Sequence, residues 1–128
     1  MVVDTSAIVA ILFKEPDRRQ FYDKILDADS CQISSVGYME AGMVLTSSLG
    51  IVAEHARDRI LHEAGVVVVP VSLTQAKLAL EAFRNFGKGR HPAGLNFGDC
   101  FSYALAKSAA EPLLFKGKDF AMTDVLVA

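Results

Sequence analysis

The run Val66-Val67-Val68-Val69-Pro70 is the stretch of this sequence that decides the fold. Four consecutive β-branched residues favour a strand, and an unbroken apolar run is typical of a strand buried on both faces of a parallel sheet. Amphipathic stretches lie on either side of it, at residues 51–64 and 72–87. Because short apolar runs alternate with amphipathic stretches along the rest of the chain too, the pattern indicates an α/β fold with a parallel sheet.

The same patterns assign the other elements. Strands are expected at residues 1–4, 31–34 and 112–115, so the sheet has four strands, or five if residues 125–127 join it. Helices are expected at residues 6–13, after Pro16, from Ser34 or Ser35 to Leu49, and at 51–64, 72–87 and 97–110. Gly50 is placed to end one helix, and Ser72 with Gln75 to begin another. Residues 97–110 are almost entirely apolar, which predicts a buried central helix.

Composition limits the class of protein. The chain has 128 residues, 52% hydrophobic and 22% charged, as expected of one globular domain spanning residues 1–128. No apolar run approaches the roughly 18–20 residues that cross a bilayer, and Asp4 interrupts the amino terminus, so neither a membrane span nor a signal peptide is expected. Cys31 and Cys100 are far apart in apolar surroundings, which fits buried free thiols and a cytoplasmic location. The net charge of −2 neither excludes nor indicates a nucleic-acid partner, because acids bound to metal would no longer repel it.

Two acidic residues stand out by position. Asp4 ends the first expected strand, and ligands of open parallel sheets bind beyond the carboxyl ends of the strands. An ordinary helix cap would also explain Asp4. Glu40 has Val36, Met43 and Val44 one turn away, which predicts that it lies on an apolar stripe facing the core. Because residues 36–56 contain no Lys or Arg, a buried Glu40 would need a distant cation or a metal.

Three more acids follow. Asp99 lies in the first turn of the apolar helix, where the helix dipole favours negative charge, and we expect it to point into a cleft. Asp119 follows the 112–115 strand, and Asp124 precedes the last apolar run. Carboxylates gathered in one crevice repel one another, so a positive charge must compensate. Hard oxygen ligands without Cys or His favour Mg²⁺ or Mn²⁺, and such a site suits phosphodiester hydrolysis.

With these motifs identified, the sequence resembles the PIN-domain proteins, specifically the VapC-type toxin ribonucleases of bacterial toxin–antitoxin pairs. The resemblance rests on MVVDTSA at residues 1–7, Glu40, GLNFGDCFSYALA at residues 94–106 and LLFKGKDF at residues 113–120. It implies a three-layer α/β/α PIN-like domain whose central parallel sheet has four or five strands. It also implies an Mg²⁺- or Mn²⁺-dependent endoribonuclease that acts on RNA, forms a homodimer and is inhibited by a cognate antitoxin.

The resemblance assigns residue roles as well. Asp4, Glu40 and Asp99 match the family's catalytic, metal-binding acids, and Asp119 is taken as the fourth. Many members carry that acid two residues earlier, where this chain has Gly117, so Asp124 is an alternative. Thr5 and Ser6 match hydroxyl positions that orient the first acid.

Basic residues near the expected crevice are candidates to hold the substrate. They are Lys88, Arg90, Lys116 and Lys118, and contacts of this kind position a strand without reading its sequence. Two other functions stay open: a catalytically inactive PIN-fold binding module, and a housekeeping RNA-processing nuclease without an antitoxin. A haloacid-dehalogenase phosphatase is disfavoured, because it needs a second Asp where Ser6 stands.

Overall fold

The computed structural model describes residues 1–128 and contains one four-stranded parallel sheet. Its strands are β1 (Val2–Val3), β2 (Cys31–Ser34), β3 (Val66–Val69) and β4 (Leu113–Leu114), in the order β3-β2-β1-β4. The predicted α/β class is therefore confirmed. The alternative fifth strand is not formed, because Val127 makes only an isolated bridge to Leu113.

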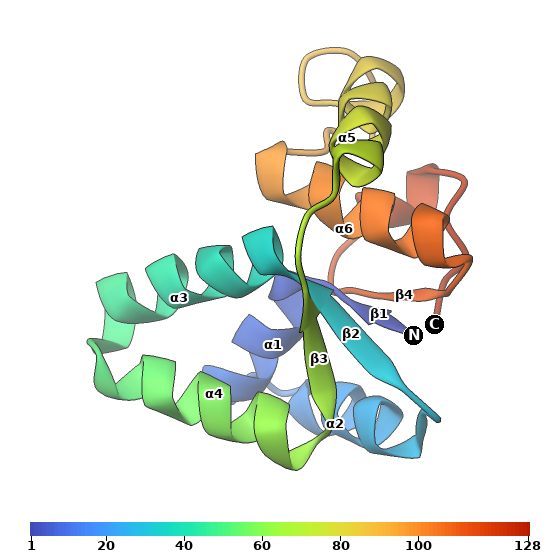
Figure 1. Cartoon of the computed structure of the whole chain (residues 1–128). Helices are drawn as coiled ribbons and strands as arrows, with labels where there is room; N and C mark the ends of the chain where they lie inside the picture. The colour runs from blue at the N-terminus through green and yellow to red at the C-terminus, as the bar shows by residue number, and fades with distance from the viewer.

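Six α-helices cover the sheet, and the predicted helices are all present within a few residues of their expected ends. They are α1 (Thr5–Leu12), α2 (Arg18–Asp27), α3 (Ser35–Leu49), α4 (Val52–Glu63), α5 (Leu73–Phe86) and α6 (Phe97–Ala109), followed by the short 3₁₀ helix η1 (Phe120–Met122). Alternate residues of β1 face opposite layers: Val2 packs with α5 and α6, and Val3 packs with α1 to α4. Figure 1 shows the resulting three layers, with α5 and α6 on one side of the strands.

The strand order creates one place where a ligand crevice is expected. The chain builds outward from β1 to β2 and β3, and then returns to place β4 on the other side of β1. The topological switch point therefore lies between β1 and β4, and open α/β sheets bind ligands beyond the carboxyl ends of the strands there. Asp4 follows β1 directly and its backbone N–H donates to Leu114 O at 2.9 Å, so it stands at this point.

The prediction that residues 66–70 form a strand buried on both faces was wrong in its burial. β3 is an edge strand, paired only with β2 from Cys31↔Val66 to Ser34↔Val69. Only Val66 is buried, whereas Val67 and Val68 are 60% and 38% exposed. A β-branched run favours a strand wherever it lies in the sheet, so the run carried no information about its position.

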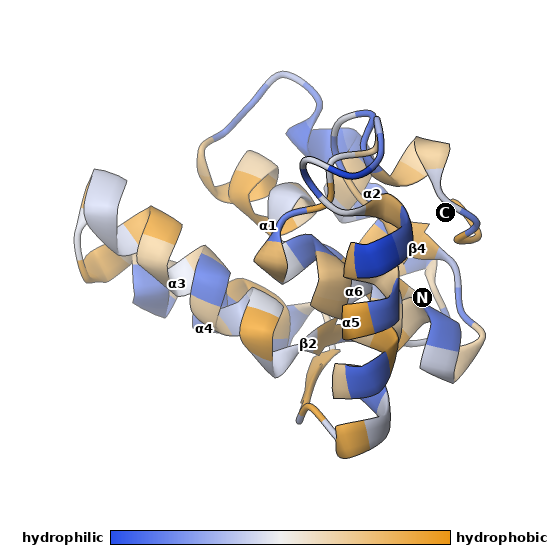
Figure 2. Ribbon diagram, turned by 90° about the horizontal axis from the view of Figure 1, so that it is seen from above, coloured by the Kyte–Doolittle hydropathy of each residue, from blue (hydrophilic) through white to orange (hydrophobic).

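The α3–α4 hairpin extends away from the other helices, with hydrophobic segments along α3 (Figure 2). Met43 and Val44 are exposed, so the predicted apolar stripe through Glu40 does not face the core. The buried face of α3 consists of Gly37, Ala41, Gly42 and Leu45. No helix has the length and apolar character needed to cross a membrane.

Candidate active site

Asp4 is the most buried acidic side chain of the site, 3% exposed. As the N-cap of α1, its Oδ2 accepts hydrogen bonds from Ser6 N at 2.9 Å and from Ser6 Oγ at 2.6 Å. Its Oδ1 is buried and has no hydrogen-bond partner. The helix-cap explanation therefore accounts for one oxygen of Asp4 and leaves the other unexplained.

Glu40 is half-buried in α3, and its carboxylate turns toward α1 and α6. Thr5 Oγ1 donates a hydrogen bond to Glu40 Oε2 at 2.9 Å. Both carboxylate oxygens lie against Gly98, where a Cβ would come within 2.2 Å of Oε2. Burial raises the pKa of Glu40, the Thr5 hydrogen bond opposes this shift, and the charge of Asp4 adds to it. Glu40 forms no salt bridge with any Lys or Arg. The buried face of α3 is a different one from the apolar stripe predicted around Glu40.

Asp99 lies in the first turn of α6 and belongs to a capping box. Its Oδ2 accepts from Asn96 N at 2.8 Å, and Asn96 Oδ1 accepts from Asp99 N at 2.9 Å. Burial raises its pKa to about 6, and the neighbouring charges of Asp4, Glu40 and Asp119 act in the same direction, while the Asn96 hydrogen bond opposes them. Four carboxylates separated in the sequence therefore influence one another at the switch point.

The side chains are not arranged as a finished ligand cage. No group of three or more His, Cys, Asp or Glu side chains is positioned to hold a metal ion together. Asp4 turns toward Ser6, and Asp99 turns toward the backbone of Asn96. Asp119 is exposed at the start of η1. To hold one ion jointly, the acids would therefore have to move closer together.

Asp124, the alternative fourth acid, has another environment. Its carboxylate accepts hydrogen bonds from Tyr103 Oη at 2.7 Å and from Lys107 Nζ at 3.0 Å. These contacts lower its pKa, with the Tyr103 hydrogen bond first and the Lys107 hydrogen bond second. Because Lys107 is two turns beyond Asp99 on α6, Asp124 lies toward the opposite end of that helix.

The four candidate substrate-binding residues differ in their surroundings. Lys116 forms ion pairs with Glu15 and Asp17. Lys118 is exposed and has no ion pair. Lys88 borders a groove of about 550 Å³ between α5 and α6, and the Arg90 guanidinium lies 5.1 Å from the centroid of the Phe83 ring in the same region.

Two contacts at this site were missed by reasoning from the sequence. Gly98 leaves the space that the Glu40 carboxylate occupies, and Ser6 links Asp4 to the loop after β4 through a hydrogen bond from Lys116 N. A glycine directly before an acid in a helix's first turn was the available signal for the first contact. Nothing local in the sequence indicates the second, because its partners are 110 positions apart.

The fold and these acids together define a PIN domain: the PIN domain family profile matches residues 1–126, and the chain belongs to this family. Within it, the relatives are VapC ribonucleases. Ribonuclease VapC28 of Mycobacterium tuberculosis is 51% identical over 126 residues, which cover 98% of this chain and 95% of the relative. Ribonuclease VapC of Mycolicibacterium smegmatis is 49% identical over 125 residues, covering 98% and 97%. The predicted relationship to VapC-type ribonucleases, the toxins of toxin–antitoxin pairs, is confirmed.

Solved structures agree on the fold. The crystal structure of M. tuberculosis VapC20, described as a sarcin–ricin loop cleaving toxin, superposes with a TM-score of 0.81 at 17% identity, covering 99% of this chain and 97% of that one. A toxin–antitoxin complex from Klebsiella pneumoniae contains a chain with a TM-score of 0.74 at 16% identity, covering 99% and 95%. At these identities the likeness concerns the three-layer architecture alone.

Proposed function

We propose that this chain is an Mg²⁺- or Mn²⁺-dependent endoribonuclease that hydrolyses RNA phosphodiester bonds, with Asp4, Glu40, Asp99 and Asp119 as the metal-binding and catalytic acids. The observation that carries the proposal is the buried Oδ1 of Asp4, which has no partner. It stands at the switch point, among acids whose charges raise the pKa of Asp99. An orphaned carboxylate oxygen in such surroundings calls for a cation.

The residues present fit a divalent ion. All the donors are carboxylate oxygens, the ligands preferred by Mg²⁺ and Mn²⁺. No Lys or Arg forms a salt bridge with Asp4, Glu40 or Asp99, so their charges are not neutralised by side chains. Asp99 uses only Oδ2 in its capping box, which leaves Oδ1 free.

When bound, a divalent cation lowers the pKa of a water molecule and neutralises charge that develops on the phosphate. The protein's own residues supply positioning and proton transfer. Ser6 fixes the orientation of Asp4, and Thr5 fixes that of Glu40. Glu40 Oε1 makes no hydrogen bond, and the raised pKa of Glu40 suits it to accept a proton from an attacking water. We expect Lys88, Arg90 and Lys118 to contact the RNA backbone outside the acids, because all three side chains are free of ion pairs.

We further propose that a cognate antitoxin inhibits this enzyme in the cytoplasm and that the enzyme is a homodimer. Support for a protein partner comes from the Klebsiella pneumoniae toxin–antitoxin complex, which shares the fold. Large apolar side chains also remain exposed on three helices, namely Met39 and Met43 on α3, Leu80 on α5 and Phe97 on α6. Exposed apolar side chains of this size are common at protein interfaces, which supports a partner.

A cleavage and metal-binding assay tests the proposed function. Wild-type protein should bind Mn²⁺ stoichiometrically in calorimetry and cut single-stranded RNA, whereas Asp4→Asn and Asp99→Asn should lose most of both activities and keep a cooperative unfolding transition. Normal cutting by either variant would refute the assignment. Absence of Mn²⁺ binding by the wild type would instead support the inactive binding module. Unchanged cutting in the presence of a candidate antitoxin protein would favour a housekeeping nuclease.

A further inference from the structure

The loop that follows β4 is attached to the catalytic acids through its backbone. Lys116 N donates a hydrogen bond to Ser6 Oγ at 2.9 Å, and Ser6 Oγ donates in turn to Asp4 Oδ2 at 2.6 Å. The Ser6 hydroxyl therefore joins the first acid to the segment that continues to Asp119. Gly117, with φ of +107°, lies between Lys116 and Asp119 in this loop.

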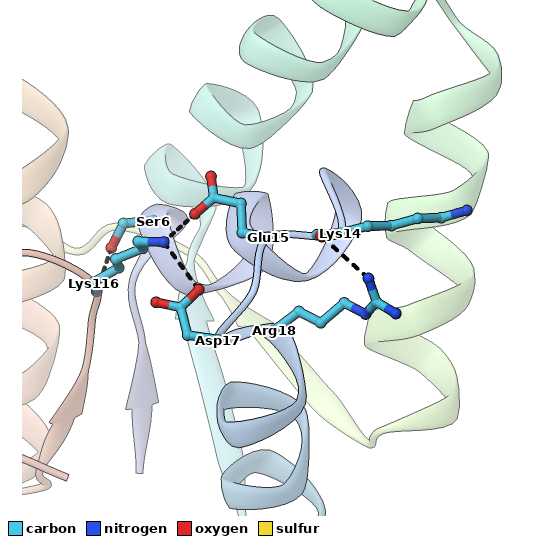
Figure 3. Close-up of polar contacts among 6 residues, drawn as sticks. All are labelled: Ser6, Lys14, Glu15, Asp17, Arg18 and Lys116. Carbon is cyan, nitrogen blue, oxygen red and sulfur yellow. Dashed lines mark hydrogen bonds and ion pairs between the residues drawn. The ribbon is translucent and has the colours of Figure 1, made fainter.

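The same lysine is also fixed by its side chain (Figure 3). Lys116 Nζ forms ion pairs with Glu15 and, at 2.9 Å, with Asp17. All three side chains are between one third and two fifths exposed. The two hydrogen bonds also raise the pKa of Lys116, Glu15 contributing most, so the ammonium stays charged. One cation thus holds two carboxylates that come from a different part of the chain.

The segment that carries these two carboxylates is itself well held. It is the connection between α1 and α2, in which Lys14 adopts a left-handed conformation with φ of +56°. Glu15 N donates to Ala10 O at 3.0 Å, and Arg18 Nη1 donates to Lys14 O at 3.1 Å. A non-glycine residue in this conformation is uncommon and persists where surrounding contacts determine it. The connection can therefore act as a fixed support for Lys116.

We propose that Lys116 is a positioning residue whose ion pairs with Glu15 and Asp17 hold the 115–119 loop, and with it Asp119, in place for divalent-metal binding. The inference rests on the proposed function and deepens it. Without the ion pairs between Lys116 and the two carboxylates, the loop would sample more conformations, and an incoming ion would have to order it. That ordering costs binding free energy, so the affinity for metal falls although every ligand is still present.

This role differs from the substrate contact that the sequence suggested for Lys116. A lysine already shared by two carboxylates is a poor phosphate ligand, because binding RNA would require both ion pairs to break. The two roles predict different results when Glu15 and Asp17 are neutralised. If Lys116 contacts RNA, freeing it would strengthen RNA binding. If its ion pairs hold the loop, freeing it would weaken metal binding.

Three variants separate these roles. Lys116→Met keeps the length of the side chain and removes the ion pairs, whereas the double variant Glu15→Gln/Asp17→Asn removes them from the other side. Lys118→Met is the matched control, because Lys118 belongs to the same loop and has no ion pair. For each, Mn²⁺ affinity is measured by calorimetry, kcat and KM are measured with a single-stranded RNA, and the fold is checked by thermal unfolding.

Lys116→Met and the double variant should both weaken Mn²⁺ binding by about 3- to 10-fold, less than the 10- to 100-fold typical when a direct partner of a ligand is removed. Both should lower kcat and leave KM for RNA unchanged, and Lys118→Met should leave Mn²⁺ affinity unchanged. A simple charge effect would move the first two variants in opposite directions, since one removes a positive charge and the other removes negative charges.

Two results would overturn the inference: wild-type Mn²⁺ affinity in both variants, or a rise in KM for Lys116→Met together with a fall in KM for the double variant. The latter would identify Lys116 as a substrate contact. A wild-type protein that neither binds Mn²⁺ nor cuts RNA would contradict the proposed function itself, and it is measured first in the same series.

Discussion

The carboxylate of Glu40 lies directly against the Cα of Gly98. A Cβ at position 98 would come 2.2 Å from Glu40 Oε2 and 2.7 Å from Oε1, which is closer than atoms can approach. Thr5 Oγ1 holds the same carboxylate from the α1 side at 2.9 Å. The absence of a side chain on Gly98 therefore lets α6 deliver Asp99 to within electrostatic reach of Glu40.

Gly98→Ala should displace Glu40 and lower RNA cleavage by at least about 10-fold, because a misplaced catalytic group costs orders of magnitude in rate. Stability should change little or rise, since alanine favours a helix over glycine by roughly 1 kcal/mol. The measurement is kcat together with the free energy of unfolding. In a double-mutant cycle, Gly98→Ala should have no additional effect on kcat in a Glu40→Ala background. An additive effect would show that the alanine acts through something other than Glu40.

The raised pKa of Asp99 predicts a pH-dependent stability in the metal-free protein. Its folded pKa of about 6 exceeds the ordinary 3.8, so this carboxyl's stabilising contribution is complete below pH 4 and is lost as the pH rises through 6. Asp99→Asn retains the capping contact without the charge. In a chelating buffer at pH 8 it should be more stable than the wild type by roughly 1–2 kcal/mol after allowance for partial exposure.

Urea unfolding between pH 4 and pH 8 measures this difference, which should vanish near pH 4. Added Mn²⁺ should reverse the order at pH 8, because only the wild type would bind the ion well. An Asp99→Asn variant that is less stable than the wild type at pH 8 in the chelating buffer would contradict the electrostatic explanation.

Local sequence patterns predicted most of this fold, because they act over a few residues. Ser34 and Ser72 cap their helices through Val36 N and Gln75 N, and Gly50 ends α3 with φ of +75°. The position of a strand within the sheet depends on distant partners instead. The Val66–Val69 run therefore predicted a strand correctly and its double-sided burial wrongly, since β3 has a neighbour on one side only.

Part of the candidate site was predictable, because two of its acids occupy positions that local patterns identify. Asp4 and Asp99 were indicated by their places at a strand end and in a helix's first turn, and the structure puts both at the switch point. Glu40 was singled out on an incorrect argument, because its apolar neighbours Met43 and Val44 are exposed. What brings it to the site is contact with Thr5 and Gly98, which no helical periodicity can reveal.

Asp119 and Asp124 should respond differently to neutralisation. Asp119→Asn should lower Mn²⁺ affinity and kcat, because Asp119 acts electrostatically on Asp99. Asp124→Asn should leave both unchanged and reduce stability at pH 7 by about 0.5–1 kcal/mol, the size expected for exposed charge-assisted contacts. The lowered pKa of Asp124 means that its stabilising contribution is present above about pH 4 and is lost as the pH falls further.

These two variants can be compared by calorimetry, cleavage assays and urea unfolding at pH 7 and pH 3. The stability difference between Asp124→Asn and the wild type should be smaller at the lower pH, because the Asp124 carboxylate begins to be protonated there. Loss of Mn²⁺ binding in Asp124→Asn, with full binding in Asp119→Asn, would exchange the roles of the two acids.

Lys88 and Arg90 should contribute to RNA binding without contributing to the chemistry. Both lie on the loop before α6, Lys88 at the groove and Arg90 over Phe83, and neither forms an ion pair that would have to break. The variant Lys88→Ala/Arg90→Ala should raise KM for single-stranded RNA and leave kcat and Mn²⁺ affinity unchanged. The slope of log affinity against log salt should fall by about 0.7 for each phosphate contact removed. Arg59→Ala on α4 removes a positive charge without touching this loop, so it should leave that slope unchanged. Equal slopes for the loop variant and the wild type would mean that the RNA follows another path across the enzyme.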